Sequence, residues 1–160
     1  MPKRLRVPKH PMAEQPKIKI LFLCTGNSCR SQMAEGWARH LAGDTLEPFS
    51  AGTAPHGLDP RAVQVMAEAG VDISNHQSKG LDNLKGIEFS WVITVCDRAR
   101  ESCPVFPGAA GVTHRSFPDP PAMAAAEQDP QRQLDHYRSV RDQIRDFVAG
   151  LPAMLSQGPS

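Results

Sequence analysis

The sequence predicts a single α/β domain on a mostly parallel sheet, and three observations support this prediction. Apolar, β-branched runs alternate with segments of helical periodicity along the chain. The 160 residues are 40% hydrophobic and 22% charged, which is typical of one domain with a buried core. No apolar run approaches the length of a membrane span or of a signal peptide.

The first half of the chain predicts two strand–helix pairs. Residues 18–24 are apolar and partly β-branched, which suits a buried strand, and residues 30–41 carry apolar side chains at helical spacing. Residues 46–50 predict a short second strand. An aspartate N-cap followed by a proline at the first helical position predicts a helix over 59–69.

The second half is expected to add two strands and a long amphipathic helix. The strands are predicted at 90–96 and 112–116, and the helix at 134–151, where apolar residues recur at helical spacing. Residues 97–107 are polar and end in prolines, which predicts a loop. The proline-rich run 117–121 is expected not to be helical.

Charge and the amino-terminal segment limit the class of partner. The 18 basic and 17 acidic residues nearly cancel, so we expect neither a nucleic-acid nor a membrane partner. Residues 1–16 hold four prolines and four basic side chains, and they predict a disordered, proline-rich basic extension. Residues 17–155 are expected to form the single folded domain.

A polar loop between the first predicted strand and helix has the composition of an oxyanion site. Cys24 and Arg30 are the ends of a Cys-X5-Arg-Ser sequence, in which small residues can turn their backbone N–H groups inward. Arg30 would add a charged fork, and the resulting positive field should lower the pKa of Cys24 to give a nucleophilic thiolate. Asn27 could hold the shape of the loop, and Ser31 could donate to the sulfur. The residues expected to bind the oxyanion are Thr25, Gly26, Asn27, Ser28, Cys29, Arg30 and Ser31.

Other interpretations of the same residues are open at this point. The loop could be a simple turn with a buried cysteine at a strand end, or a non-catalytic anion-binding module. A zinc site is disfavoured because the six residues between Cys96 and Cys103 exceed the usual ligand spacing. Cys24, Cys96 and Asp119 each follow a predicted strand, so the carboxyl edge of a parallel sheet could bring them together.

The motif and its surroundings resemble the low-molecular-weight tyrosine phosphatase superfamily, and more narrowly its thioredoxin-coupled arsenate reductases. The resemblance rests on Cys24 to Trp37, and extends to Ser50-Ala51-Gly52, 70–76, 92–96 and Asp119-Pro120. It implies a three-layer sandwich, with a four-stranded parallel sheet and helices on both faces. It also implies an enzyme of arsenic detoxification. The small number of cysteines and the lack of a signal-length apolar stretch predict a cytoplasmic protein, which we expect to be a monomer.

The number of cysteines favours reduction over hydrolysis. A phosphatase needs one cysteine, whereas the two-electron reduction of arsenate needs a second thiol and benefits from a third. By resemblance, Cys24 attacks arsenate held by Arg30 while Asp119 acts as general acid, and a Cys24–Cys96 and then a Cys96–Cys103 disulfide follow. Thioredoxin, or alternatively glutaredoxin, would reduce the last disulfide. The alternative is a low-molecular-weight phosphatase that hydrolyses phosphomonoesters through a Cys24 phosphoenzyme.

The sequence departs from the resemblance at a cation site. Some related reductases bind potassium through residues that match Asn27, Glu35 and Ser50 together with an aspartate, and that aspartate is replaced here by Lys79. The Lys79 ammonium could occupy the place of the cation, and the alternative is a solvated surface lysine. No metal ligand and no tightly bound cofactor is otherwise predicted.

Overall fold

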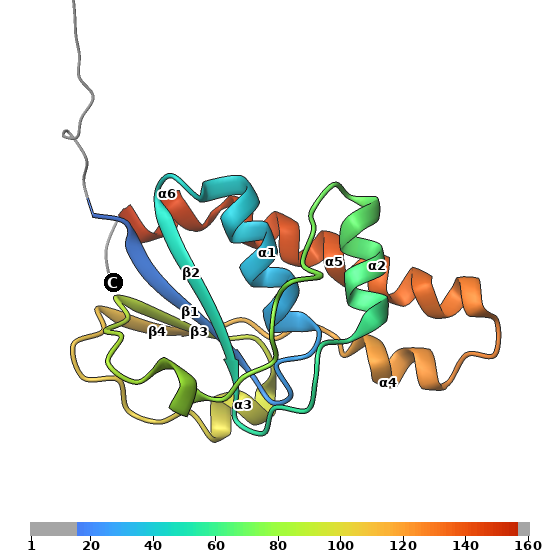
Figure 1. Ribbon diagram of the computed structural model, residues 1–160, viewed down its shortest axis with the longest axis horizontal. Helices are drawn as coiled ribbons and strands as arrows, with labels where there is room; N and C mark the ends of the chain where they lie inside the picture. The colour runs from blue at the N-terminus through green and yellow to red at the C-terminus, as the bar shows by residue number, and fades with distance from the viewer. Residues whose placement is uncertain (1–15, 157–160) are drawn as a thin grey trace, which may run out of the picture.

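The computed structural model describes residues 16–156 and contains a four-stranded, fully parallel sheet (Figure 1). The strand order is β2-β1-β3-β4, and β1 pairs with both β2 and β3. The parallel sheet with helices confirms the predicted fold class. The strands are β1 Ile18–Cys24, β2 Leu46–Gly52, β3 Trp91–Thr94 and β4 Gly111–His114. The extension predicted at residues 1–16 lies outside the described residues except for Pro16.

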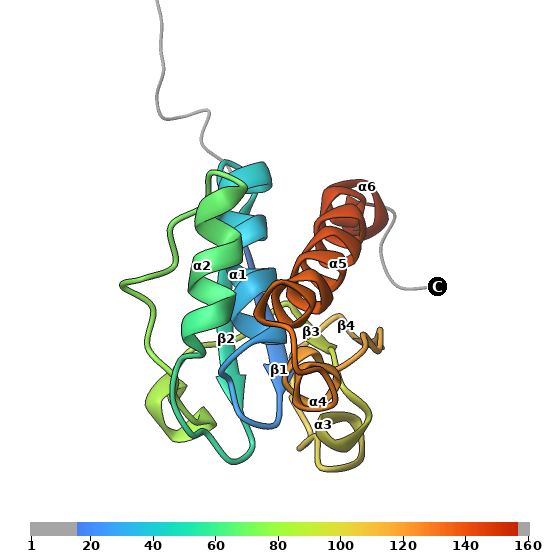
Figure 2. The ribbon, with the colours of Figure 1, turned by 90° about the vertical axis from the view of Figure 1, so that its right-hand side faces the viewer.

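Helices α1 and α5 pack against each other on one face of the sheet (Figures 1 and 2). Helix α2 packs on α5, where Arg141 Nη1 donates to the Val65 carbonyl at 2.9 Å. The predicted start of α2 is confirmed, because the Asp59 side chain accepts from the Arg61 N–H. These helices are α1 Arg30–Ala42, α2 Pro60–Glu68 and α5 Pro130–Ala149.

The opposite face of β2 is covered by aromatic side chains rather than by a long helix. Ser50 points toward α1, where its hydroxyl donates to Glu35 Oε1 at 2.6 Å, so the neighbouring Phe49 points to the other face. There the Phe49 ring packs edge-on against Phe89, which packs in turn against Phe106. The 3-10 helix η2, Leu81–Leu84, lies in the segment that precedes Phe89.

Two local predictions are wrong, and the end of one predicted helix differs. The segment predicted as a loop after β3 begins with helix α3, Asp97–Glu101, because Ala99 is fully buried against the sheet. The run 117–121 was expected to exclude helix, yet α4, Pro120–Ala125, begins within it, since proline is tolerated in the first helical turn. The long carboxyl-terminal helix is interrupted at Gly150, and α6, Leu151–Ser156, follows.

The register of the parallel strands places the chemistry-bearing residues at one edge. Cys24 ends β1, and Cys96 follows the end of β3, which pairs with β1. Within residues 16–156, no helix is long and apolar enough to cross a membrane.

Candidate active site

A cavity of about 800 Å³ opens at the carboxyl edge of the sheet. Its wall joins the loop after β1 to the segments after β3 and β4. The structure therefore brings together the predicted residues of all three segments. Lining residues that were predicted from the sequence are Cys24, Thr25, Gly26, Ser28, Cys29, Arg30, Cys96 and Asp119.

The loop over 24–31 wraps the Cys24 sulfur in hydrogen bonds. The Asn27 N–H donates to Cys24 Sγ at 3.2 Å, and Ser31 Oγ lies 2.8 Å from the same sulfur. Asn27 holds the loop in a left-handed conformation with φ of 46°. Gly52 of β2 lets the loop approach closely, because a Cβ there would lie 2.5 Å from the Thr25 carbonyl oxygen.

The Asn27 side chain determines which way the Ser31 hydroxyl points. Asn27 Oδ1 accepts from the Lys79 backbone N–H at 2.8 Å and from Gln32 Nε2 at 3.0 Å. Its Nδ2 therefore faces Ser31 Oγ at 2.8 Å and donates to it. Ser31 consequently has its own hydrogen free to donate to Cys24 Sγ, an arrangement that stabilises a thiolate.

Gln32 and His76 extend this network, although the sequence alone predicts no role for either. Gln32 Nε2 also donates to the Asn27 and Gln77 carbonyls, at 3.1 and 3.0 Å, which leaves Oε1 facing His76 Nδ1 at 2.9 Å. His76 Nδ1 must then carry a hydrogen. Burial lowers the pKa of His76 despite the nearby Glu35 carboxylate, which favours the neutral ring. The one feature of the sequence that could have indicated a role for Gln32 is its position directly after the Cys-X5-Arg-Ser motif.

The expectation of a lowered pKa at Cys24 is wrong for this conformation. Burial raises the pKa of the Cys24 thiol, and this effect exceeds the lowering by hydrogen bonds from Ser31 and Asn27. Cys24 is only 4% exposed.

Arg30 and Asp119 meet at the mouth of the cavity. Arg30 Nη1 donates to the Phe117 carbonyl at 2.9 Å, and Nη2 lies 3.7 Å from Asp119 Oδ1. The Arg30 side chain is 16% exposed and that of Asp119 48% exposed. Both predicted residues thus border the space above the Cys24 sulfur.

The remaining cysteines occupy different environments, and all four cysteines are free thiols. Cys96 is buried, and its sulfur lies 3.4 Å from Thr25 Oγ1. Cys103 is partly exposed, and partial burial raises its pKa. Cys29 is buried in the part of the loop that lines the cavity, and burial raises its pKa well above the usual value.

Helix α3 separates Cys96 from Cys103. Residues in a helix advance about 1.5 Å each, so this conformation holds the two Cα atoms on the order of 10 Å apart. A disulfide requires a Cα separation below about 7 Å. A disulfide between these cysteines therefore requires α3 to unfold.

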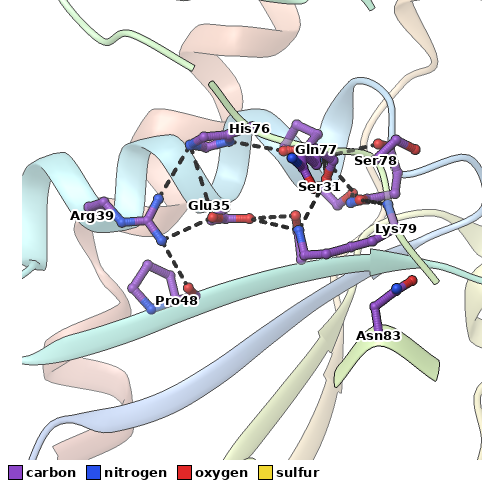
Figure 3. A network of polar contacts seen from close by, with 12 residues as sticks. Ser31, Glu35, Arg39, Pro48, His76, Gln77, Ser78, Lys79 and Asn83 are labelled. Carbon is purple, nitrogen blue, oxygen red and sulfur yellow. Dashed lines mark hydrogen bonds and ion pairs between the residues drawn. The ribbon is translucent and has the colours of Figure 1, made fainter. Parts of the chain in front are cut away.

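The predicted cation region is a cluster of charged and polar groups around Glu35 (Figure 3). Glu35 Oε1 accepts from Ser50 Oγ and lies 3.9 Å from Lys79 Nζ. Glu35 Oε2 accepts from Arg39 Nη2 at 3.0 Å. Lys79 Nζ also donates to the Gln77 carbonyl at 3.2 Å. In the part of the chain that the structure describes, no group of three or more His, Cys, Asp or Glu side chains could hold a metal ion.

Comparisons with known proteins agree with this geometry. The sequence model of the family described as low molecular weight phosphotyrosine protein phosphatase matches residues 19–158. Arsenate reductase 2 of Staphylococcus saprophyticus subsp. saprophyticus is 42% identical over 128 residues, which cover 80% of this chain and 91% of that protein. The solved structure of an arsenate reductase in the phosphate binding state is 30% identical with a TM-score of 0.70, covering 86% of this chain and 98% of that one. One in the oxidized state is 29% identical with a TM-score of 0.67, covering 85% and 97%.

Proposed function

Because this chain belongs to the low molecular weight phosphotyrosine protein phosphatase family, we propose that it is an arsenate reductase working through Cys24, Cys96 and Cys103. One observation carries the proposal. A second cysteine, Cys96, lies beside Thr25 of the oxyanion loop, and a third, Cys103, is partly exposed beyond α3. Hydrolysis of a phosphomonoester has no use for the second and third thiols.

The first step forms a bond between sulfur and arsenic. Arsenate enters the cavity, where the loop amides and the Arg30 guanidinium bind its oxygens. The Cys24 thiolate attacks arsenic, the bond from arsenic to one arsenate hydroxyl breaks, and that hydroxyl leaves as water after Asp119 delivers a proton to it. An oxyanion draws Arg30 toward the loop, and its guanidinium then opposes the burial that raises the pKa of Cys24.

The second step is the two-electron reduction. The Cys96 thiolate attacks Cys24 Sγ, the sulfur–arsenic bond breaks, and its electron pair remains on arsenic, which leaves as arsenite. The product on the protein is a Cys24–Cys96 disulfide. Thr25 Oγ1 is positioned to donate to Cys96 Sγ and so to favour the attacking thiolate.

The third step moves the disulfide to the surface. Cys103 attacks Cys96 Sγ, which frees Cys24 and leaves a Cys96–Cys103 disulfide. A thioredoxin dithiol, or alternatively glutaredoxin, supplies two electrons and two protons to restore both thiols. Helix α3 must unfold during this step because it separates the two cysteines. A donor of this kind is consistent with the cytoplasmic location expected from the sequence.

Lys79 takes the place of the potassium ion that the resemblance implies. Its ammonium lies 3.9 Å from Glu35 Oε1, and its backbone N–H holds Asn27 Oδ1. A fixed cation therefore already neutralises the buried Glu35 carboxylate. The parent protein should gain no more thermal stability from potassium than from sodium, whereas Lys79→Asp should gain a potassium-specific increase. A potassium-specific increase in the parent would contradict this assignment.

The decisive experiment couples arsenate to NADPH oxidation through thioredoxin reductase and thioredoxin. Cys24→Ser, Cys96→Ser and Cys103→Ser should each abolish turnover, while Cys29→Ala should retain it. Turnover that survives loss of Cys96 or Cys103 would refute the relay. Glutaredoxin and its reductase, run in parallel, identify the donor.

The same variants separate reductase from phosphatase. Cys96→Ser should lose arsenate reduction but retain hydrolysis of an aryl phosphate, because hydrolysis uses Cys24, Arg30 and Asp119 alone. A parent protein that hydrolyses the aryl phosphate and shows no arsenate-dependent oxidation with either donor would establish the phosphatase instead.

A further inference from the structure

Few contacts hold helix α3, the segment that separates the second and third relay cysteines. Its Ala99 is buried, whereas Asp97, Arg98, Arg100 and Glu101 are exposed. A helix of this length has little stability by itself, because its few backbone hydrogen bonds do not offset the unfavourable free energy of helix nucleation. Its helical conformation therefore depends on contacts with the rest of the fold.

His114 supplies such a contact from the end of β4. Its Nε2 lies 2.9 Å from Oδ1 of Asp97, the first residue of α3, and its Nδ1 lies 2.8 Å from Thr94 Oγ1 at the end of β3. A carboxylate can only accept, so Nε2 carries a hydrogen and donates to Asp97. Thr94 is 1% exposed and the His114 side chain 22% exposed, so the ring is anchored on its inner side.

We propose that His114 is a positioning residue that acts through Asp97 to hold α3 helical and thereby to disfavour the Cys96–Cys103 disulfide. This inference rests on the proposed relay and assigns a residue that controls its third step. Asp97 directly follows Cys96, so a tether on Asp97 also fixes the Cys96 backbone beside the cavity. The helical form keeps Cys96 close to Thr25 for its attack on Cys24 and away from Cys103.

The contact between His114 and Asp97, which we call the tether, sets the order in which the Cys24–Cys96 and Cys96–Cys103 disulfides form. While it is closed, Cys96 meets Cys24 and cannot reach Cys103. When it opens and α3 unfolds, Cys103 can reach Cys96. The equilibrium constant for forming the Cys96–Cys103 disulfide therefore includes, as a factor, the equilibrium constant for opening the tether and unfolding α3. A variant that opens the tether more easily raises the former by the same factor.

The test measures that equilibrium constant in a Cys24→Ser background. The protein is equilibrated with mixtures of reduced and oxidised glutathione, and the Cys96–Cys103 disulfide is quantified by mass spectrometry after the free thiols are alkylated. Oxidised glutathione takes up the two electrons and two protons that the thiols release. His114→Ala should raise the equilibrium constant about two- to fivefold, the effect of losing one partly exposed side-chain contact.

Two variants distinguish a tether from a general loss of stability. His114→Gln can still donate to Asp97 from the same place as Nε2, so it should stay within twofold of the parent. His136→Ala removes a comparable pair, His136 Nε2 to Glu127 Oε2 at 2.9 Å, far from α3, and should leave the equilibrium unchanged.

Native-state hydrogen exchange gives an independent measurement on the reduced protein. The N–H of Arg100 donates to the Cys96 carbonyl and that of Ser102 to the Arg98 carbonyl. Both amides should exchange about two- to fivefold faster in His114→Ala and not in His136→Ala.

The outcomes separate this inference from the relay. An unchanged equilibrium constant and unchanged exchange in His114→Ala would overturn the tether, as would an equal shift in His136→Ala. A parent that forms no Cys96–Cys103 disulfide at any glutathione ratio would overturn the relay itself, and the tether with it.

Discussion

Ser31→Ala tests the source of the reactivity of Cys24. The Ser31 hydroxyl is fully buried, lies 2.8 Å from Cys24 Sγ, and accepts from Asn27, so its hydrogen is directed at the sulfur. Removing it should raise the pKa of Cys24 further, because burial then acts with less opposition.

The size of the effect follows from the kind of hydrogen bond. A hydrogen bond to a charged group is worth about 1.5–3 kcal/mol, which corresponds to roughly a ten- to hundredfold change in an equilibrium constant. Ser31→Ala should therefore lower the thiolate fraction at neutral pH by about ten- to a hundredfold. Arsenate turnover should fall by a similar factor if attack by Cys24 limits the rate.

The assay is alkylation by iodoacetamide between pH 6 and 10 in a Cys96→Ser, Cys103→Ser background. Cys29 stays unreactive near neutral pH because burial raises its pKa well above the usual value. The rate should increase with pH through the neutral range in the parent, since the pKa of Cys24 is itself raised. The Ser31→Ala curve should lie at higher pH.

Ser28→Ala is the matched control, because Ser28 belongs to the same loop and has no hydrogen bond to the sulfur among the described side chains. Its alkylation curve should coincide with that of the parent. Equal rates in Ser31→Ala and the parent, or an equal loss in Ser28→Ala, would refute the assignment of the Ser31 hydrogen to Cys24.

Three further predictions concern the cavity and the fold. Arg98 lines the cavity and Arg100 does not. Arg98→Ala should therefore raise the KM for arsenate several-fold with kcat little changed, and Arg100→Ala should leave the KM unchanged. Equal KM values for the two variants would contradict this prediction. The Tyr137 hydroxyl donates to Asp59 Oδ2 at 2.6 Å beneath the loop, so Tyr137→Phe should lower the free energy of unfolding in urea by about 1–2 kcal/mol, and an unchanged midpoint would count against it. Burial lowers the pKa of His76 in the folded protein, so as pH falls the unfolded chain binds a proton at this residue before the folded protein does. The free energy of unfolding should therefore fall as pH drops through the ordinary histidine range of about 6.5 and below. The fall should be smaller in His76→Gln, which urea titrations at each pH can check.

The local pattern of the sequence was sufficient for the elements that carry their own signals. The apolar run before Cys24 and the helical spacing after Arg30 predicted β1 and α1, with the oxyanion loop between them. Asp59 and its following proline predicted the start of α2. Parallel strands also predicted that Cys24, Cys96 and Asp119 would share one edge, and all three line the same cavity.

Helix α3 shows why other elements were missed. Residues 97–101 have no apolar periodicity, and their helix depends on the burial of Ala99 and on His114, which lies 17 residues from Asp97. A window along the chain holds no information about a partner at that separation. The same limit concealed Gln32 and His76, which are 44 residues apart and meet only in the folded protein.

The sequence by itself determined the family, the motif, and the division of the four cysteines into two in the loop, one after a strand and one further on. Only the tertiary structure decided the electrostatic state of these groups. The pKa of Cys24 is set by how deeply the fold buries the sulfur and by which hydrogens point at it. Both depend on long-range packing, because Lys79 orients Asn27 from 52 residues away and Phe117 holds Arg30 from 87 residues away.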